Sequence, residues 1–163
     1  MAEQLWAPWR IRYILESKKE EGCFLCNAGA SRDDRASLVV YRGKLSFCIL
    51  NRYPYNNGHL LVAPYAHKAD LADLGGDECV DLMNSIVVMQ RRLGRAMKPD
   101  GYNIGLNIGR TSGAGLPGHL HFHVVPRWEG DTNFMPVLAD TKVIPQALEE
   151  VFDLLAKQND DGK

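Results

Sequence analysis

Three histidines alternate with apolar residues in the stretch His119-Leu120-His121-Phe122-His123-Val124. Strict alternation is typical of a β-strand with one buried face, because successive side chains of a strand point to opposite sides. We expect a strand over residues 118–126 that carries the three imidazoles on one face, with their roots about 6.6 Å apart. Imidazoles titrate near neutral pH and are seldom gathered in a core. The pattern therefore predicts a face on which chemistry takes place.

Three interpretations of this face are open. Alternate histidines on a strand can bind one zinc ion, which would make the stretch a metal site. A neutral imidazole nitrogen can instead attack phosphorus and form a covalent intermediate. A purely structural role, with hydrogen-bonded histidines in a polar interior, suits one histidine better than three in register.

A glycine-rich loop, residues 109–118, leads directly into the histidines. Glycines let backbone N–H groups approach phosphate oxygens without obstruction by side chains. Thr111 and Ser112 add hydroxyl donors, and Arg110 adds a positive charge. Such a loop is an unspecific signal when it stands alone, but directly before three histidines it favours a phosphate-containing ligand.

The sequence has four cysteines. Cys48 lies in an apolar run and Cys79 in an expected helix, so we interpret both as buried thiols. Cys23 and Cys26 form a C-x-x-C pair, which in a reducing compartment indicates metal or redox chemistry rather than a structural disulfide. The spacing alone leaves zinc, redox chemistry and chance open.

Length and composition predict one globular domain. A chain of 163 residues with 45% apolar and 24% charged residues can bury a sizeable core. The net charge of -1 gives no general attraction to nucleic acid or to an anionic membrane, so neither is expected as a partner. The N-terminus lacks the apolar core of a signal peptide, and no apolar run approaches the ~20 residues of a membrane span. We therefore expect a cytoplasmic protein.

The hydrophobic pattern predicts an α+β fold with an antiparallel meander sheet, one long helix and a C-terminal helix. Alternating or apolar runs predict strands over residues 38–41, 45–51, 59–64 and 102–108. A stripe of apolar residues predicts the long helix over residues 76–98, which Pro99 ends. The remaining expectations are a short helix over residues 9–17, a tight turn over 22–27, a surface loop over 28–36 and the C-terminal helix over 145–158.

Taken together, these residues resemble the histidine-triad (HIT) family. Residues 119–125 match the family motif, in which each histidine is followed by an apolar residue, and residues 51–64 resemble the family's nucleotide-binding segment. Residues 5–10 and 126–134 resemble the branch that includes diadenosine tetraphosphate phosphorylase-like and dinucleoside polyphosphate hydrolase-like members. The similarity spans nearly the whole chain. We expect a single domain with an N-terminal zinc knuckle (1–36), a catalytic core (37–128) and a C-terminal extension (129–163).

The resemblance implies an enzyme, usually a homodimer, that cleaves dinucleoside polyphosphates such as diadenosine tetraphosphate. His121 would attack the α-phosphorus and become nucleotidylated, while His123 and His59 would contact phosphate oxygens. Water or inorganic phosphate would then release the nucleotide. The remaining substrate contacts would come from Asn51 at the ribose, from Asn107 beside the phosphates, and from Thr111, Ser112, Gly113 and Gly115 in the loop.

In one place the chain departs from the family pattern. Many members carry a glutamine and a serine or threonine shortly before the triad, where they donate hydrogen bonds to the phosphates and the leaving group. Gly115 and Leu116 occupy those positions here and offer no side-chain donor. Thr111 and Ser112 could compensate, or inorganic phosphate could enter the space. The alternative functions are a nucleotide sensor with little turnover and a nucleoside phosphoramidase.

The resemblance also gives the two N-terminal cysteines their partners. Some family members with a C-x-x-C pair bind zinc with two further histidines, whose positions are held here by His67 and His119. Together, Cys23, Cys26, His67 and His119 would form a closed tetrahedral site, which is typical of structural zinc. Free thiols with an exposed His67 are one alternative, and a hydrolytic zinc held by the triad itself is another. Aromatic residues that could frame a base-binding slot or a dimer interface are Trp6, Trp9, Trp128 and Phe134.

Overall fold

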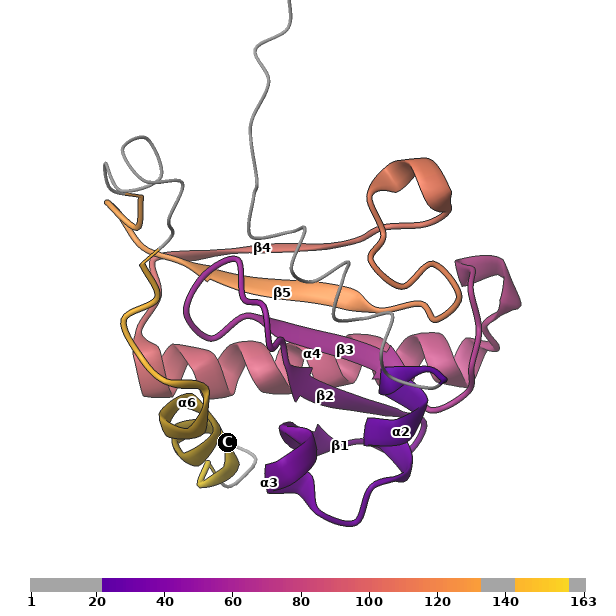
Figure 1. Cartoon of the computed structure of the whole chain (residues 1–163), viewed down its shortest axis with the longest axis horizontal. Coiled ribbons are helices and arrows are strands. Elements are labelled where there is room, and N and C mark those ends of the chain that lie inside the picture. The colour runs from indigo at the N-terminus through magenta and orange to yellow at the C-terminus, as the bar shows by residue number, and fades with distance from the viewer. Residues whose placement is uncertain (1–21, 133–142, 159–163) are drawn as a thin grey trace, which may run out of the picture.

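The computed structural model describes residues 22–132 and 143–158 of the chain. These residues form an antiparallel sheet of five strands in the order β1-β2-β3-β5-β4 (Figure 1). The strands are β1 (Val39–Arg42), β2 (Ser46–Leu50), β3 (Leu60–Pro64), β4 (Gly101–Leu106) and β5 (Phe122–Arg127). The first three strands form a meander, and β5 then lies between β3 and β4. The predicted α+β class and antiparallel sheet are confirmed.

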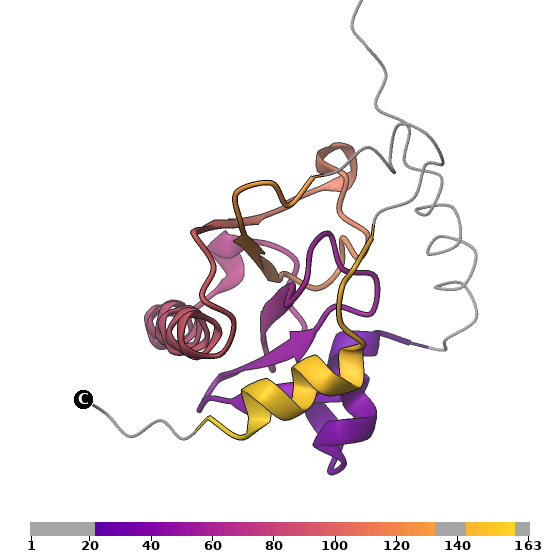
Figure 2. The same cartoon turned by 90° about the vertical axis from the view of Figure 1, so that its left-hand side faces the viewer.

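Helix α4 (Gly76–Met97) lies along one face of the sheet, where it contacts β2 and β3. Figure 2 shows this helix end-on beside the sheet. The helix ends at Met97, and the next residue, Lys98, has a left-handed φ of 47° and is followed by Pro99. The apolar stripe that predicted the helix is its buried face, and its members Leu82, Ile86, Met89 and Leu93 are at most 3% exposed.

Three shorter helices lie near strand β1. Helices α2 (Phe24–Ala30) and α3 (Asp34–Ser37) precede β1 in the chain, and α6 (Leu148–Ala156) contacts β1 and α4. The turn expected over residues 22–27 and the surface loop expected over 28–36 are therefore wrong, because both stretches contain helix. Helices of one or two turns show no apolar period in the sequence, and tertiary packing rather than propensity stabilises them.

The strand predicted over residues 118–126 begins only at Phe122, and this correction has a local cause. The pairing of β3 and β5 ends at Val62 and Phe122, and the same register would place His121 opposite Ala63 and then Leu120 opposite Pro64. Proline has no N–H to donate to a strand ladder, so the ladder cannot continue through the position opposite Leu120. The Leu120 N–H donates outside the sheet, to the Lys68 carbonyl at 2.6 Å. The three histidines therefore do not lie in one row on a strand.

The other predicted strands and the long helix are found with ends shifted by at most two residues, and α6 begins three residues later than expected. Two short 3-10 helices, η1 (Leu71–Asp73) and η2 (Arg110–Ser112), lie in the β3–α4 and β4–β5 connections. The helix predicted over residues 9–17 lies outside the described residues. Within the described ranges, none of the helices has the length and apolar character needed to cross a bilayer.

Candidate active site

Three histidine side chains gather where β3 begins beside β5. His59 directly precedes β3, and its Nε2 lies 2.9 Å from Nδ1 of His123 on β5. The ring of His121 lies edge-on to that of His123, with centroids 5.0 Å apart. His59 and His121 are buried and His123 is half-buried. The structure thus brings together the three residues that the sequence predicted as catalytic.

A glycine fixes the direction in which the chain enters this cluster. Gly58, just before His59, has a left-handed φ of +71°, and a Cβ at this position would lie 2.9 Å from Sδ of Met97. A side chain would therefore be strained by the backbone conformation and would press against the Met97 side chain of helix α4. The turn that delivers His59 requires glycine.

Hydrogen bonds assign a tautomer to each of the three rings. The Tyr55 backbone N–H donates to Nδ1 of His59 at 3.1 Å, so neutral His59 carries its proton on Nε2 and donates it to Nδ1 of His123. His123 then holds its own proton on Nε2. Nδ1 of His121 lies 2.8 Å from the His119 carbonyl oxygen, which can only accept. His121 therefore holds its proton on Nδ1 and has a free lone pair on Nε2.

The environment keeps these imidazoles neutral near pH 7. Burial lowers the pKa of His59 from 6.5 to about 3, and the charges of His123 and His121 act in the same direction. Burial likewise lowers the pKa of His123 to about 4, with a smaller contribution from His121. Burial also lowers the pKa of His121, against the opposite effect of its hydrogen bond to His119. A neutral ring with a free lone pair is the form in which histidine acts as a nucleophile.

Asn51 joins the cluster from the end of β2. Its Nδ2 lies 3.2 Å from Nδ1 of His59, and its Oδ1 accepts from the Tyr53 N–H at 2.9 Å. Each atom of the amide keeps one further hydrogen-bonding position. The amide is therefore fixed beside the histidines and can still bind the hydroxyl groups of a ligand.

A second cluster joins the N-terminal cysteines to two histidines. Potential ligand atoms of Cys23, Cys26, His67 and His119 all lie within 4.8 Å of one another. Nδ1 of His119 is 3.2 Å from Sγ of Cys23 and 3.5 Å from Sγ of Cys26. Nδ1 of His67 is 3.2 Å from Sγ of Cys26. The structure thus gathers the four residues that were predicted as zinc ligands.

The chemistry of this second cluster suits a metal ion. Nε2 of His119 donates to the Pro64 carbonyl at 2.9 Å, so the lone pair on Nδ1 faces the sulfur atoms. Burial raises the pKa of Cys26, and the hydrogen bond and charge of Cys23 act in the same direction. A divalent cation would relieve this penalty by binding both thiolates. Two thiolates and two imidazoles form the closed donor set that is typical of structural zinc.

Comparison with known proteins identifies the family. The family described as HIT domain matches residues 32–130, more than half of the chain. The chain belongs to the HIT family. It is 40% identical to the AP-4-A phosphorylase of Mycobacterium tuberculosis, over 96% of this chain and 84% of that protein. It is 36% identical to the asymmetrical bis(5'-nucleosyl)-tetraphosphatase of Schizosaccharomyces pombe, over 58% of this chain and 52% of that protein.

A solved structure of similar fold contains zinc. A Zn-bound histidine triad family protein from Mycobacterium smegmatis superposes on this HIT protein with a TM-score of 0.65 at 25% identity. The match covers 83% of this chain and 91% of the other. The HIT-like fold expected from the sequence is thus confirmed.

The glycine-rich loop of this HIT protein connects β4 to β5 (Figure 1). Leu106 pairs with Phe122, so Asn107 leaves β4 next to the position of His121 in the register. Ser112 Oγ donates within the loop, to the Gly109 carbonyl at 2.8 Å. Thr111, Ser112 and Gly115 are exposed, and Gly113 is half-buried with a left-handed φ of +82°. This hydrogen bond of Ser112 stays within the loop, and the substrate contacts expected of Asn107 and the loop stay predictions.

Sequence reasoning missed the residues that hold the loop before His59. The ring of Tyr55 stacks on the His59–His123 pair, with its centroid 4.7 Å from that of His59. Nδ2 of Asn56 donates to the carboxylate of Asp131 at 2.8 Å. The only signal in the sequence was a run of aromatic, proline and amide residues directly before the Gly-His pair, which also suits an ordinary turn.

The aromatic residues expected at a base slot or a dimer interface are only partly described. Trp128 is half-buried, and its Nε1–H donates to the Met97 carbonyl at 3.3 Å, which ties the loop after β5 to the end of α4. Trp6, Trp9 and Phe134 lie outside the described residues.

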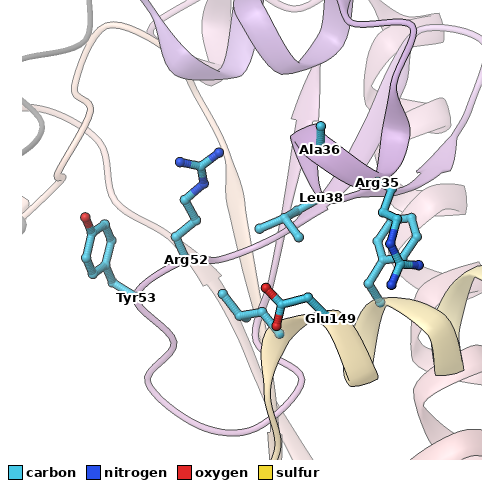
Figure 3. Close-up of a pocket in the computed structure, with 8 residues that line it drawn as sticks. Arg35, Ala36, Leu38, Arg52, Tyr53 and Glu149 are labelled. Atoms are coloured by element: carbon cyan, nitrogen blue, oxygen red, sulfur yellow. The ribbon is translucent and has the colours of Figure 1, made fainter.

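A cavity of about 410 Å³ lies between α3, α6 and the loop that follows β2 (Figure 3). It is lined by Arg35, Ala36, Leu38, Arg52, Tyr53, Leu148, Glu149 and Phe152. Arg35 is paired with Asp153 and lies over the Phe152 ring, 5.5 Å from its centroid. The charged groups of the rim have opposite signs, and none of the predicted site residues lines this cavity.

Proposed function

We propose that this HIT protein is a nucleotidyl hydrolase or transferase that cleaves dinucleoside polyphosphates such as diadenosine tetraphosphate. One observation carries the proposal. The His119 carbonyl holds the Nδ1 proton of His121, which leaves the Nε2 lone pair free beside His123. The names of the M. tuberculosis phosphorylase and the S. pombe tetraphosphatase support the substrate class.

In the first half-reaction, Nε2 of His121 attacks the α-phosphorus of the substrate. A P–N bond forms, and the P–O bond to the polyphosphate leaving group breaks. His121 becomes positively charged, and its Nδ1–H donates to the His119 carbonyl throughout. His123, with its proton on Nε2, would donate to a phosphate oxygen and so stabilise the transition state. Asn51 would bind the ribose hydroxyls.

In the second half-reaction, an acceptor attacks the same phosphorus. The P–N bond breaks, its electron pair returns to Nε2 of His121, and the acceptor oxygen loses its proton to solvent. We propose inorganic phosphate as the acceptor, in line with the name of the M. tuberculosis relative. The positions of Gly115 and Leu116, which carry no side-chain donor, would leave room for a second anion.

The test is the analysis of products from diadenosine tetraphosphate with and without inorganic phosphate. ADP that appears only with phosphate identifies a phosphorylase, whereas AMP and ATP under both conditions identify a hydrolase. Protein trapped at low temperature should carry AMP on His121. His121→Ala should lower turnover at least about a thousandfold, as expected for the loss of a nucleophile. Normal turnover by this variant would refute the proposal.

We further propose that Cys23, Cys26, His67 and His119 hold a structural zinc ion. The support is the donor geometry together with the zinc of the M. smegmatis relative. Bound zinc would join helix α2 to the segment before β5 rather than take part in the reaction. His119 links the two clusters, because its ring faces the sulfur atoms while its carbonyl holds His121. The metal would therefore fix the group that aligns the nucleophile.

We also propose the homodimer that the resemblance implies. Strand β4 is at one edge of the sheet, and its Ile104 is 43% exposed. On α4, the apolar side chains of Val80, Met83 and Val87 are exposed at helical spacing. Antiparallel pairing of two β4 edges would satisfy their backbone groups and bring a second copy beside this apolar surface.

A nucleotide sensor with little turnover is the second candidate. The observation that favours it is that Gly115 and Leu116 lack side-chain donors for a leaving group. Tight binding of diadenosine tetraphosphate without release of ADP, AMP or ATP would identify this function.

A further inference from the structure

Tyr55 covers two of the three clustered histidines although it lies at the surface. Its ring centroid is 4.7 Å from that of His59 and 5.6 Å from that of His123, with interplanar angles of 32° and 24°. Tyr55 is 37% exposed, whereas His59 beneath it is 1% exposed. The tyrosine ring therefore separates the His59–His123 pair from solvent on one side.

The backbone of Tyr55 acts on the same pair. Its N–H donates to Nδ1 of His59, where the Asn51 amide makes a second hydrogen bond. Both donors keep the proton of His59 on Nε2, and that proton is directed at Nδ1 of His123 at 2.9 Å. Since Nδ1 of His123 accepts, its own proton must lie on Nε2, which is the atom available to a phosphate oxygen.

We propose that Tyr55 is a positioning residue whose ring excludes water from the His59–His123 hydrogen bond and so keeps His123 in the orientation and tautomer that donate to the substrate. A hydrogen bond inside a protein is stronger when water cannot compete for its donor and acceptor. His123 is only half-buried, so water that reached the pair could replace His59 as its partner and let the ring turn. Donors fixed before the reaction begins are the ones that lower its barrier.

The loop that carries Tyr55 is anchored independently of the tyrosine ring. Nδ2 of Asn56 donates to the Pro126 carbonyl at 2.9 Å and to the Asp131 carboxylate at 2.8 Å. The Asn56 carbonyl accepts from the His59 N–H at 3.2 Å. Substitution of the Tyr55 side chain should therefore leave the loop in place and remove only the ring that covers the His59–His123 pair.

The test compares Tyr55→Phe and Tyr55→Leu with Tyr53→Leu, a matched control in the same loop whose side chain lines the cavity of Figure 3. The first measurement is proton NMR of the His59 Nε2–H in the substrate-free protein. We expect a slowly exchanging signal in the wild type, in Tyr55→Phe and in Tyr53→Leu. In Tyr55→Leu, solvent exchange of this proton should be at least about tenfold faster, because water can reach the pair.

The second measurement is steady-state kinetics with diadenosine tetraphosphate, and it rests on the proposed function. We expect kcat of Tyr55→Leu to fall about tenfold, less than removal of a direct donor would cost, while KM changes by less than about twofold. Tyr55→Phe should keep kcat, because the ring rather than the hydroxyl provides the cover. If Tyr55→Leu does not fold, Tyr55→Met takes its place in both measurements.

Several results would overturn the inference. One is a His59 proton that stays protected in Tyr55→Leu. Another is an equal loss of kcat in Tyr53→Leu, which would indicate a general disturbance of the loop. A loss in Tyr55→Phe as large as in Tyr55→Leu would assign the effect to the hydroxyl. A protected proton in a wild type without turnover would contradict the proposed function but support the role of Tyr55.

Discussion

Among the single residues, His119 contributes to both clusters with different atoms. Its ring donates to the Pro64 carbonyl through Nε2 and presents Nδ1 to the sulfur atoms of Cys23 and Cys26. Its carbonyl accepts the Nδ1 proton of His121. Substitution of His119 would therefore remove a donor from the proposed metal site. It would also affect His121, the proposed nucleophile, if the backbone carbonyl of residue 119 shifted.

The burial of His59 predicts a stability that depends on pH. The unfolded chain binds a proton at His59 near pH 6.5, whereas the folded protein resists protonation until about pH 3. Between these values the unfolded state binds more protons, so the free energy of unfolding falls as the pH is lowered from 6.5. The slope from this residue approaches about 1.4 kcal/mol per pH unit. Urea denaturation between pH 7.5 and 5 measures it.

The control for this measurement is His59→Gln, which removes the titrating group and keeps a polar side chain. Burial also lowers the pKa of other histidines, among them the half-buried His123, and these remain in the variant. The difference in slope between wild type and His59→Gln therefore isolates His59. Identical slopes in the two proteins would contradict the assigned burial of a neutral ring.

The helices and strands that could be predicted from the sequence are those whose apolar pattern extends over enough residues to be recognised. Helix α4 was visible because its buried stripe persists over several turns, and strands β1 to β4 were visible because each is a distinct run between turn residues. Helices α2 and α3 were missed because they are too short to show a period. The start of β5 was misplaced because its cause is the partner residue Pro64, more than fifty positions away in the sequence.

The zinc site proposed at the N-terminal end of helix α2 predicts that the thermal stability of the protein depends on bound metal. Treatment with a chelator, or Cys23→Ser, should lower the midpoint of thermal unfolding by about 5–10 °C, which for a chain of this size corresponds to about 2–3 kcal/mol. Metal analysis of the purified protein should give one zinc per chain. The matched control is Cys79→Ser, since Cys79 lies on α4 outside the cluster. A wild type that is equally stable with and without chelator would argue against structural zinc.

The attachment of α6 depends on a buried guanidinium. Arg92 is 8% exposed and donates through Nη1 to the Val40 carbonyl at 3.0 Å and to the Leu155 carbonyl at 3.4 Å. Arg92→Met keeps the apolar stem and removes these donors, so we expect a loss of about 2–3 kcal/mol in urea denaturation. Arg35→Ala, which removes an exposed pair with Asp153 on the same helix, should change stability far less. Equal effects of the two substitutions would contradict this account.

At the scale of the whole molecule, the exposed apolar surface predicts association. Met83→Glu combined with Ile104→Lys places charges on α4 and on the β4 edge, where the side chains are 52% and 43% exposed in the single chain. If two copies meet there, sedimentation should show a dimer for the wild type and a monomer for the double variant. Substitution of Leu71, which is 42% exposed on η1, is the control and should leave the dimer intact. A wild type that sediments as a monomer would refute the proposed pairing.

The candidate site was largely predictable as two sets of residues, but the contacts that hold each set were not. Side-chain chemistry and motif spacing pointed to the histidines and cysteines, because few folds require such groups at such intervals. The resemblance to the HIT family assigned them to a catalytic set and a zinc-binding set. The orientation of the rings depends on strand register and on the Pro64 carbonyl, which are properties of the folded chain. The cover by Tyr55 likewise depends on the conformation of a loop. The single-domain division of the chain, the cytoplasmic location and the roles of the loop residues stay predictions.

Pro64 has no amide proton, and this limits how much of the histidine motif can lie in the β3–β5 ladder. A donor at this position would let the ladder continue past Ala63 and Pro64. If the strand then extended to His119, the side chain of His119 would project to the same face as that of His123. All three rings would face the same way, and the thiols of α2 would lose a partner. Because the ladder between β3 and β5 ends before Pro64, His119 and His121 of the same motif can belong to different clusters.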